Sequence, residues 1–461
     1  MDIQSFYHSI NGKTVGFLGI GGSNLPLIKM FAQHGAVVSA RDRRTEEKLG
    51  KTADDLKQLG VTLRLGDDYL QDLNEEILFR TPGMRYYLPE LVAARKRGIV
   101  VTSEMEVFFD LCPCKIYAVT GSDGKTTTTT ILSEMLKAEG KTVHLGGNIG
   151  NPLLPEIENI RPQDAAVVEL SSFQLISMRR SPDVAVVTNV SPNHLDMHKD
   201  MQEYIDAKRN ILLHQNAFAR AVVNADNAIT AGFVKDIRGE TLCFSRKAKC
   251  ERGAWLNDKN EIVMTLNGTD TPVMNASDIK IPGGHNIENY MAAICALWGT
   301  VKIENMVRVA KAFGGVEHRS EFVRELDGVK YYNDSIGTTP SRTMNGMLKL
   351  FDRKLILIAG GYDKKIPFDS FGTAVVEHVK TLVLIGATAD KIEESVKAAP
   401  NYRSGSPKIL RAQSLEQAVR LCREEAVAGD IVALSPACAS FDMFPNYETR
   451  GEEFKRLVNL L

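Results

Sequence analysis

A glycine- and lysine-containing run between an apolar strand and a helix is the feature that most limits how this chain can fold. Residues 115–119 form a short apolar run, and residues 126–139 have a helical pattern that stops at Gly140. The run Thr-Gly-Ser-Asp-Gly-Lys-Thr at 120–126 joins them. A strand that passes through a glycine loop directly into a helix is the repeating unit of a parallel α/β sheet. The run therefore predicts an α/β fold.

The same alternation recurs along the whole chain. Apolar runs that read as strands lie at 15–20, 36–40, 77–79, 99–102, 165–170, 184–188, 354–359, 381–385 and 430–434. Residues 216–280 look less regular. At about 150 residues per domain, 461 residues fit about three domains. We predict a Rossmann-like N-terminal domain (1–113), a central P-loop-type domain with a mostly parallel sheet (114–316) and a Rossmann-like C-terminal domain (317–461).

Composition excludes several classes of protein. Lys and Arg number 56 against 57 acidic residues, which predicts no affinity for nucleic acid or membrane surfaces. The N-terminus has no secretory pattern and no apolar run is long enough to span a membrane, so we expect a cytoplasmic protein. The seven cysteines suggest no disulfide framework. Cys112 and Cys114 lack further metal ligands nearby and are interpreted as ordinary thiols in a linker.

The run at 120–126 has the chemistry of a phosphate-binding loop. Helix N-termini attract anions, glycines let the backbone approach a phosphate, and a lysine such as Lys125 reaches its outer oxygens. The full P-loop pattern is missing, because Val119 stands where the first glycine would be. A Gly-Lys turn that merely opens a helix is the alternative. Threonines 127–130 are poor helix formers, and we interpret them as hydroxyls for Mg²⁺ or phosphate.

Polar residues also follow the neighbouring strands. Glu169 ends one apolar run, and His194 and Asp196 follow the next. Ligands of parallel sheets bind at the carboxyl ends of strands, and a carboxylate there is a ligand for Mg²⁺. Lys208 lies in a polar helical stretch at 201–214, and periodicity alone predicts a solvated surface lysine.

The outer thirds carry weaker signals. The loop at 19–24 begins like a dinucleotide fingerprint and Asp42 stands where a ribose-binding acid would be, but Asn24 replaces the last glycine. NAD, another nucleotide or simple packing would each produce this pattern. In the last third, loops at 333–335, 360–365 and 435–442 follow strands and hold lysines and serines suited to a substrate carboxylate, although turn chemistry explains any one of them.

Eight short motifs occur in the order found in the Mur ligase family of peptidoglycan synthesis, which the chain resembles along nearly its whole length. They lie at 120–127, 147–150, 169–175, 193–196, 284–289, 317–319, 333–335 and 435–440. The resemblance is greatest to the members that add D-glutamate, because the Asp-Asn-Pro-Arg motif of relatives that add diaminopimelate or lysine is not found. It implies ATP-dependent addition of D-glutamate to UDP-N-acetylmuramoyl-L-alanine, in the cytoplasm, through an acyl phosphate.

The resemblance assigns a role to each domain. The first domain is expected to hold the UDP part of the substrate and the middle domain ATP with two Mg²⁺ ions, while the third reads the amino acid. The residues implied for the UDP substrate are Gly21, Gly22, Ser23, Asp42, Arg44, Thr81, Pro82, Gly83 and Asn148. Those implied for ATP are Gly121, Ser122, Asp123, Gly124, Lys125, Thr126, Thr127, Asn289, Arg319 and Asp334. Those implied for Mg²⁺ are Thr126, Glu169, His194 and Lys208.

Further positions follow from the same resemblance. Lys208 matches a family lysine that is carbamylated by CO₂, which overrides the surface interpretation and, with Lys125 and His194, completes the expected catalytic set. Thr338, Lys364, Ser440 and Tyr447 match positions that hold the D-glutamate carboxylates.

Two departures concern the amino-acid pocket. Ile336 stands where the family often has lysine, and Lys365 is a candidate to replace that lysine. Tyr447 stands where phenylalanine is common.

The expected reaction needs three substrates and closure of the third domain over them. The partners are UDP-N-acetylmuramoyl-L-alanine and D-glutamate, and we expect a monomer. Alternatives are a different Mur ligase, a folylpolyglutamate synthetase, an NAD-dependent oxidoreductase that uses the first domain, and a non-catalytic nucleotide-binding regulator.

Overall fold

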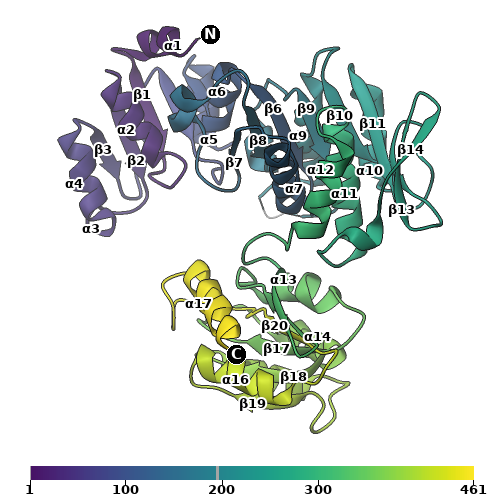
Figure 1. Cartoon of the computed structure of the whole chain (residues 1–461). Helices are drawn as coiled ribbons and strands as arrows, with labels where there is room; N and C mark the ends of the chain where they lie inside the picture. The colour runs from purple at the N-terminus through teal and green to yellow at the C-terminus, as the bar shows by residue number, and fades with distance from the viewer. Residues whose placement is uncertain (1, 194–196) are drawn as a thin grey trace. The chain divides into compact units, whose positions relative to one another are not determined.

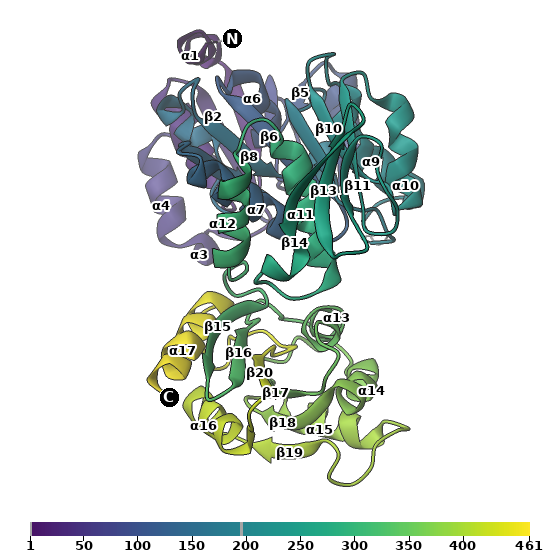
Figure 2. The same cartoon turned by 45° about the vertical axis from the view of Figure 1, so that its right-hand side comes forward.

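The chain forms two compact units in the computed structural model, which describes residues 2–193 and 197–461. The first unit contains residues 1–278 and 287–311, and the second contains 279–286 and 312–461. Figures 1 and 2 show three sheets along the chain, each with its own helices. No helix of the described residues is both long and apolar enough to cross a membrane.

The first sheet has five parallel strands in the order β3-β2-β1-β4-β5. Its strands are β1 (Thr14–Leu18), β2 (Val37–Asp42), β3 (Thr62–Leu65), β4 (Ile77–Arg80) and β5 (Val100–Thr102). Its helices are α1 (Ile3–Ile10), α2 (Leu25–Gln33), α3 (Glu46–Leu49), α4 (Lys51–Gln58), α5 (Pro89–Lys96) and α6 (Glu104–Leu111). Phe31 of α2 packs edge-on against Phe17 and Phe79, which fastens this helix to the middle of the sheet.

The second sheet has nine strands in the order β14-β13-β12-β11-β10-β9-β6-β8-β7. Its parallel part contains β6 (Lys115–Thr120), β7 (Val143–Gly147), β8 (Ala165–Glu169), β9 (Val184–Val187), β10 (Arg220–Asn224), β11 (Glu240–Ser245) and β12 (Gly253–Leu256). Its helical elements are α7 (Lys125–Ala138), η1 (Leu154–Asn159), α8 (Ser172–Leu175), α9 (Met201–Leu213), α10 (Ala228–Ala231), η2 (Gly232–Asp236), η3 (Ala276–Asp278), α11 (Gly284–Leu297) and α12 (Ile303–Ala312).

Residues 216–280 correct the prediction of a less regular stretch. They contain five strands of the second sheet, and the last two, β13 (Glu261–Leu266) and β14 (Thr269–Asn275), pair antiparallel. Asn267 and Gly268 make their turn at φ values of 53° and 77°. The edge strand β14 combines exposed polar residues with the buried Val273 and Met274, so a search for continuous apolar runs overlooks it.

One hydrophobic core cluster of the first unit joins Phe31 beside the first sheet to Val168 and Val187 in the second, and a smaller cluster around Leu78 and Leu91 packs α5 against the first sheet. The carboxylate of Glu104 in α6 is buried within the larger cluster and accepts hydrogen bonds from the backbone N–H groups of Leu153 and Leu154, both at 2.9 Å. Burial raises the pKa of Glu104 to about 7 despite these two bonds.

The second unit has a six-stranded sheet in the order β15-β16-β20-β17-β18-β19, parallel except for β15. Its strands are β15 (Glu321–Leu326), β16 (Val329–Asn333), β17 (Leu355–Ala359), β18 (Val379–Leu384), β19 (Lys408–Arg411) and β20 (Ile431–Leu434). Its helical elements are α13 (Pro340–Asn345), η4 (Met347–Lys349), α14 (Asp369–His378), α15 (Ala389–Ala398), α16 (Leu415–Glu425) and α17 (Tyr447–Leu460). Successive residues of a strand point to opposite faces, so Leu357 packs with α14 and α15 while Ile356 and Ile358 pack with α16 and α17.

Candidate active site

The glycine-lysine run forms a tight loop between β6 and α7, as predicted. The loop leaves β6 after Thr120, and α7 begins at Lys125 with its first intrahelical bond from Thr128 N to Gly124 O. The N–H groups ahead of that bond have no partner inside the helix and point out of its start. Gly121 has φ +152°, and a Cβ atom there would lie 1.9 Å from the Thr188 hydroxyl. Only glycine fits this position.

Side chains from the end of β9 and from α9 hold the loop. Asn189 accepts a hydrogen bond from the Asp123 N–H at 3.0 Å and donates one to the Asp123 carbonyl at 3.1 Å. The Ser122 hydroxyl donates to the Ser191 carbonyl at 2.9 Å and contacts the Tyr204 hydroxyl at 3.0 Å. Sequence reasoning missed Asn189 and Tyr204. Asn189 stands shortly after the end of β9, so the rule that selected Glu169 would also have found Asn189.

Lys125 folds back over the loop that precedes it. Its Nζ donates to the carbonyls of Gly121 at 3.0 Å and Ser122 at 2.9 Å. This conformation keeps the ammonium group above the glycine loop. A phosphate bound there would replace the two carbonyls as the hydrogen-bond acceptor of the ammonium group. Asn289 of α11 lies beside the same loop, since a Cβ on Gly124 would approach its Oδ1 to 2.5 Å.

The threonines of α7 correct one interpretation. Thr129 and Thr130 donate to the carbonyls four residues earlier, both at 2.8 Å, and Thr128 donates to Asn289 Oδ1 at 3.1 Å. These three hydroxyls serve the helix and its contact with α11, because a threonine inside a helix readily bonds the preceding turn. The interpretation as ligand hydroxyls now concerns Thr126 and Thr127 at the start of the helix.

Glu169 supplies a buried carboxylate at the next strand end. It pairs in register with Val119 of β6 and Gly147 of β7, so the ends of the three strands meet. Its Oε1 accepts a hydrogen bond from Asn148 Nδ2 at 2.8 Å, while its Oε2 is buried and has no hydrogen-bond partner among the described residues. A buried carboxylate oxygen without a partner is costly unless a cation or donor binds it. This observation fits Mg²⁺, which prefers oxygen ligands.

Lys208 is buried, which corrects the prediction from periodicity of a solvated lysine. Its side chain points from α9 to the loop, and Nζ donates to the Gly121 carbonyl at 2.7 Å while lying 4.7 Å from the centre of the Tyr204 ring. Burial, followed by the nearby charge of Lys125, lowers the pKa of Lys208 well below its usual value. Lys208 lies on the buried face of α9 with Tyr204, Ala207, Ile211 and Leu212, which follow helical spacing, so its charge and not the periodicity misled the prediction.

Two predicted residues of this region, His194 and Asp196, lie outside the described residues. The nearby His198 is described. It contacts the Ser172 hydroxyl at 2.9 Å and the Glu203 carboxylate at 3.1 Å, and its ring stacks on Phe173. His198 therefore joins α8 to α9.

The first-sheet loop surrounds Asp42, as the fingerprint suggested. Asp42 accepts from the Ile20 N–H at 2.7 Å and pairs with Arg44 at 2.8 Å. Burial would raise the pKa of Asp42, but the hydrogen bonds from Arg44 and Ile20 outweigh it and lower the pKa to about 2. Asn24 stands at the position of the last fingerprint glycine, and its side-chain amide donates to the carbonyls of Leu18 and Gly19. Gly21, Gly22 and Ser23 are exposed or half-buried, as are Thr81, Pro82 and Gly83.

The predicted residues of the second unit form separate groups. Asp334 is buried after β16, where it accepts from the Ser435 hydroxyl at 2.6 Å and the Ser320 N–H at 3.1 Å. Burial raises its pKa to about 6. Lys364 donates to the Thr338 carbonyl at 3.2 Å, so these two predicted residues are neighbours.

The other two amino-acid candidates of this unit are placed differently. The backbone carbonyl of Tyr447 accepts from Ser335, and Ser440 is buried. Among the described residues, neither side chain hydrogen-bonds Thr338 or Lys364. Arg319 precedes β15 and is half-buried.

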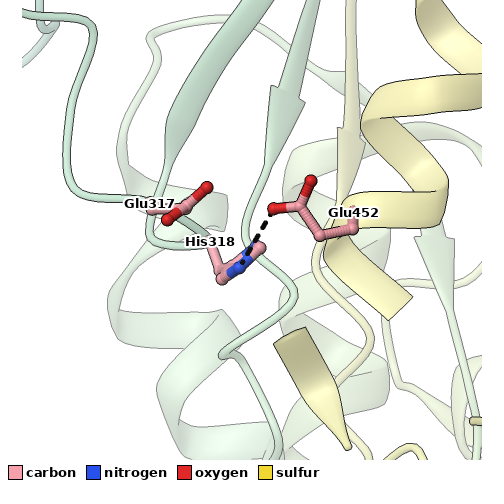
Figure 3. A group of neighbouring side chains, drawn as sticks. All are labelled: Glu317, His318 and Glu452. Carbon is pink, nitrogen blue, oxygen red and sulfur yellow. Dashed lines mark ion pairs between the residues drawn. The ribbon is translucent and has the colours of Figure 1, made fainter. Parts of the chain in front are cut away.

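Glu317, His318 and Glu452 form the only described group of three side chains with metal-ligand spacing. Figure 3 shows His318 and Glu452 facing one another, with 3.6 Å between Nε2 and the carboxylate. However, the Lys455 ammonium lies 2.6 Å from Glu317 and 2.7 Å from Glu452. This cation already balances the two carboxylates, so we interpret the group as an ion-pair cluster.

Comparisons with known proteins agree with this arrangement. The sequence model of the Mur ligase middle domain matches residues 119–297, and that of the Mur ligase glutamate ligase domain matches residues 318–438. UDP-N-acetylmuramoylalanine–D-glutamate ligase of Acetivibrio thermocellus is 52% identical over 99% of this chain and 98% of its own. The enzyme of the same name from Clostridium botulinum is 50% identical over 100% and 99%.

Solved structures support the fold. The UDP-N-acetylmuramate-alanine ligase of Thermotoga maritima superimposes with a TM-score of 0.55 at 18% identity, over 97% of this chain and 99% of that one. This likeness confirms the predicted α/β class with its three sheets. The relatives at about half identity along the full length settle the family as well: the chain belongs to the Mur ligases.

Proposed function

We propose that this protein joins D-glutamate to UDP-N-acetylmuramoyl-L-alanine with hydrolysis of ATP to ADP and phosphate. The observation that carries the proposal is the identity of 52% and 50%, over nearly the whole chain, to curated ligases named for that reaction. The loop at 120–126, with Lys125 above it and Glu169 beside it, supports an ATP site in the middle of the chain.

The first step activates the carboxylate of the muramoyl-alanine substrate. One carboxylate oxygen attacks the γ-phosphorus of ATP, the bond from that phosphorus to the bridging oxygen breaks, and ADP leaves. Lys125 exchanges its loop carbonyls for γ-phosphate oxygens, and the N–H groups at the start of α7 bind the phosphate chain. When bound, Mg²⁺ offsets the negative charge of the transferred group. Thr126, Glu169, His194 and a carbamylated Lys208 would hold it.

The carbamate on Lys208 is supported by where the amine lies. CO₂ adds only to a neutral amine, and Lys208 is buried beside the loop next to another cation, Lys125. The amine nitrogen bonds to the carbon of CO₂ and releases a proton to solvent, and the product carbamate is an anion with two oxygens. It would add an oxygen ligand beside the carboxylate of Glu169.

The second step forms the amide. The neutral amine of D-glutamate attacks the acyl carbon, and the tetrahedral intermediate collapses with loss of phosphate and a proton. Thr338, Lys364, Ser440 and Tyr447 would bind the two D-glutamate carboxylates. The neighbouring positions of Lys364 and Thr338 support this assignment.

The remaining assignments complete the proposal. Gly21, Gly22, Ser23, Asp42, Arg44, Thr81, Pro82, Gly83 and Asn148 would bind the UDP substrate. Asn289, Arg319 and Asp334 would contact ATP. The corresponding domains are 1–113, 114–316 and 317–461, and we propose that a monomer carries out the reaction in the cytoplasm.

The test is phosphate release from ATP with UDP-N-acetylmuramoyl-L-alanine present and one amine supplied at a time. D-glutamate alone should support release, whereas L-glutamate, L-alanine and L-lysine should not. Release with a different amine would support a ligase with another amino-acid substrate and would point to the pocket near Ile336 as the reason. The absence of release with every amine would contradict the proposal.

A further inference from the structure

Arg80 is a buried arginine whose guanidinium hydrogen-bonds the loop that follows β4. It is the last residue of β4 and is only 1% exposed. Its Nη1 donates to the carbonyls of Thr81, Pro82 and Met84 at 3.4, 3.2 and 2.8 Å. Three carbonyls of one short loop therefore converge on a single nitrogen. We call residues 81–84 the β4 loop.

The other nitrogen of the same guanidinium reaches the second sheet of this unit. Arg80 Nη2 donates to the Phe173 carbonyl in α8 at 2.8 Å and to the Ser177 hydroxyl at 3.4 Å. Phe173 lies four residues after Glu169, just past the strand end with the unpartnered carboxylate oxygen. One planar group thus connects the β4 loop to the segment that follows Glu169.

The charge of Arg80 is balanced inside the protein. The Ser177 hydroxyl donates to Glu106 Oε2 at 3.1 Å, and the Ser103 hydroxyl donates to the same oxygen at 3.0 Å. Burial lowers the pKa of Arg80, and the negative charge of Glu106 opposes this effect. Burying an arginine is costly unless its donors are satisfied. The chain meets this cost with five acceptors and a nearby carboxylate.

We propose that Arg80 is a positioning residue that sets the β4 loop against α8 and thereby fixes the UDP substrate relative to the strand end at Glu169. The inference rests on the proposed function, in which Thr81, Pro82 and Gly83 contact that substrate. A guanidinium suits the task because its rigid fork holds acceptors on two sides at fixed angles. Arg80, Met84 of the β4 loop and Phe173 of α8 also line one cavity of about 270 Å³. A shift of the loop or of α8 would therefore change the shape of this cavity.

The test compares Arg80→Met, which keeps the length of the side chain and removes every donor, with the wild type. We measure KM for UDP-N-acetylmuramoyl-L-alanine, ATP and D-glutamate, together with kcat and the unfolding temperature. KM for the UDP substrate should rise on the order of tenfold or more, while the KM values for ATP and D-glutamate stay within about twofold. Arg80→Lys, which keeps the charge and some donors, should recover part of the loss.

Arg220 provides a matched control in the same unit. Its Nη1 also donates to three backbone carbonyls, those of Cys295, Ala296 and Trp298, and it pairs with Glu240. Arg220→Met should lower the unfolding temperature and leave all three KM values unchanged. If Arg80 only stabilised the fold, Arg80→Met would show the same pattern.

The possible results separate the two proposals. Wild-type turnover that does not depend on D-glutamate contradicts the proposed function, whatever the variants do. If the wild type turns over as proposed, unchanged KM values in a folded Arg80→Met protein overturn the role of Arg80. If Arg80→Met does not fold, Arg80→Lys is judged by the same criterion, and a failure of both to fold would make Arg80 a structural residue.

Discussion

The phosphate loop of the first unit and the Lys364–Thr338 pair of the second unit differ in how firmly the chain holds these predicted site residues. Around 120–126, bonds from Asn189, Tyr204 and Lys208 reach the loop from two other elements. In the second unit, Lys364 is exposed and donates a hydrogen bond to the Thr338 carbonyl. A preorganised site binds charge without moving, whereas exposed side chains must be ordered when the ligand arrives. We therefore expect substitutions in the first region to affect turnover and those in the second to affect binding.

The largest effect should follow from Lys125→Ala. Loss of the only loop lysine removes a cation from the phosphoryl group, and turnover should fall on the order of 10³-fold or more. Circular dichroism and the unfolding temperature should stay close to the wild type. Lys137→Ala, at an exposed ion pair with Glu134 in the same helix, is the control and should be fully active. Normal turnover by Lys125→Ala would contradict the loop assignment.

A backbone change in the same loop should have the next largest effect. In Gly121→Ala the new Cβ would lie 1.9 Å from the Thr188 hydroxyl, so the loop must move. A displacement of about 1 Å near the reacting atoms costs about 10²-fold in rate. Gly140→Ala is matched for backbone strain, with φ +89°, but nothing lies within 4 Å of its Cβ. If both variants retained activity, the loop would tolerate the displacement. It would then be no more rigid than the Lys364 region of the second unit.

In the second unit the expected effect is on affinity. Lys364→Ala removes a charge-assisted contact to a carboxylate of about 2 kcal/mol. KM for D-glutamate should rise about 10- to 100-fold, and KM for ATP should not change. Lys365→Ala, at the adjacent exposed lysine, tests whether that residue replaces the lysine missing at 336. An equal rise in both variants would show that the two lysines share the role.

A separate effect concerns stability and its dependence on pH. The pKa of Asp334 is raised by burial from 3.8 to about 6, so the folded state favours its protonated form. Its stabilising contribution is complete below about pH 4 and is lost as pH rises through about 6, by on the order of 3 kcal/mol in total. Asp334→Asn should lose this part of the pH dependence. Urea unfolding at several pH values, monitored by hydrogen exchange in β16 and β20, would measure this part of the free energy of unfolding. Identical pH profiles for the two proteins would contradict the raised pKa of Asp334.

The difference between the regions also explains what could be predicted from the sequence. The phosphate loop is a contiguous run, so a strand, two glycines and a helix start determine its geometry locally. Strand boundaries were correct within one or two residues for the buried parallel strands, because their apolar runs are continuous.

Residues whose role depends on distant partners were harder to predict. The buried position of Lys208 was missed because its charge interrupts the apolar face that Tyr204, Ala207, Ile211 and Leu212 form on α9. Of the strands in 216–280, the edge strand β14 was missed because it mixes polar and apolar residues, whereas the buried run of β10 was simply overlooked. Arg80 also escaped notice, since a charged residue at the end of a strand is usually solvated, and its partners Phe173 and Ser177 come more than 90 residues later.

The way the chain alternates between its two units limits how it can be taken apart. Residues 279–286 belong to the second unit although they precede 287–311 of the first, so the backbone passes from one unit to the other three times. Within the second unit, Lys280 lies over the ring of Phe322 at 5.3 Å. A recombinant fragment that begins at residue 312 would expose that ring and lose part of its own packing. Exchange of the C-terminal part between relatives should therefore carry the short 279–286 segment along with it.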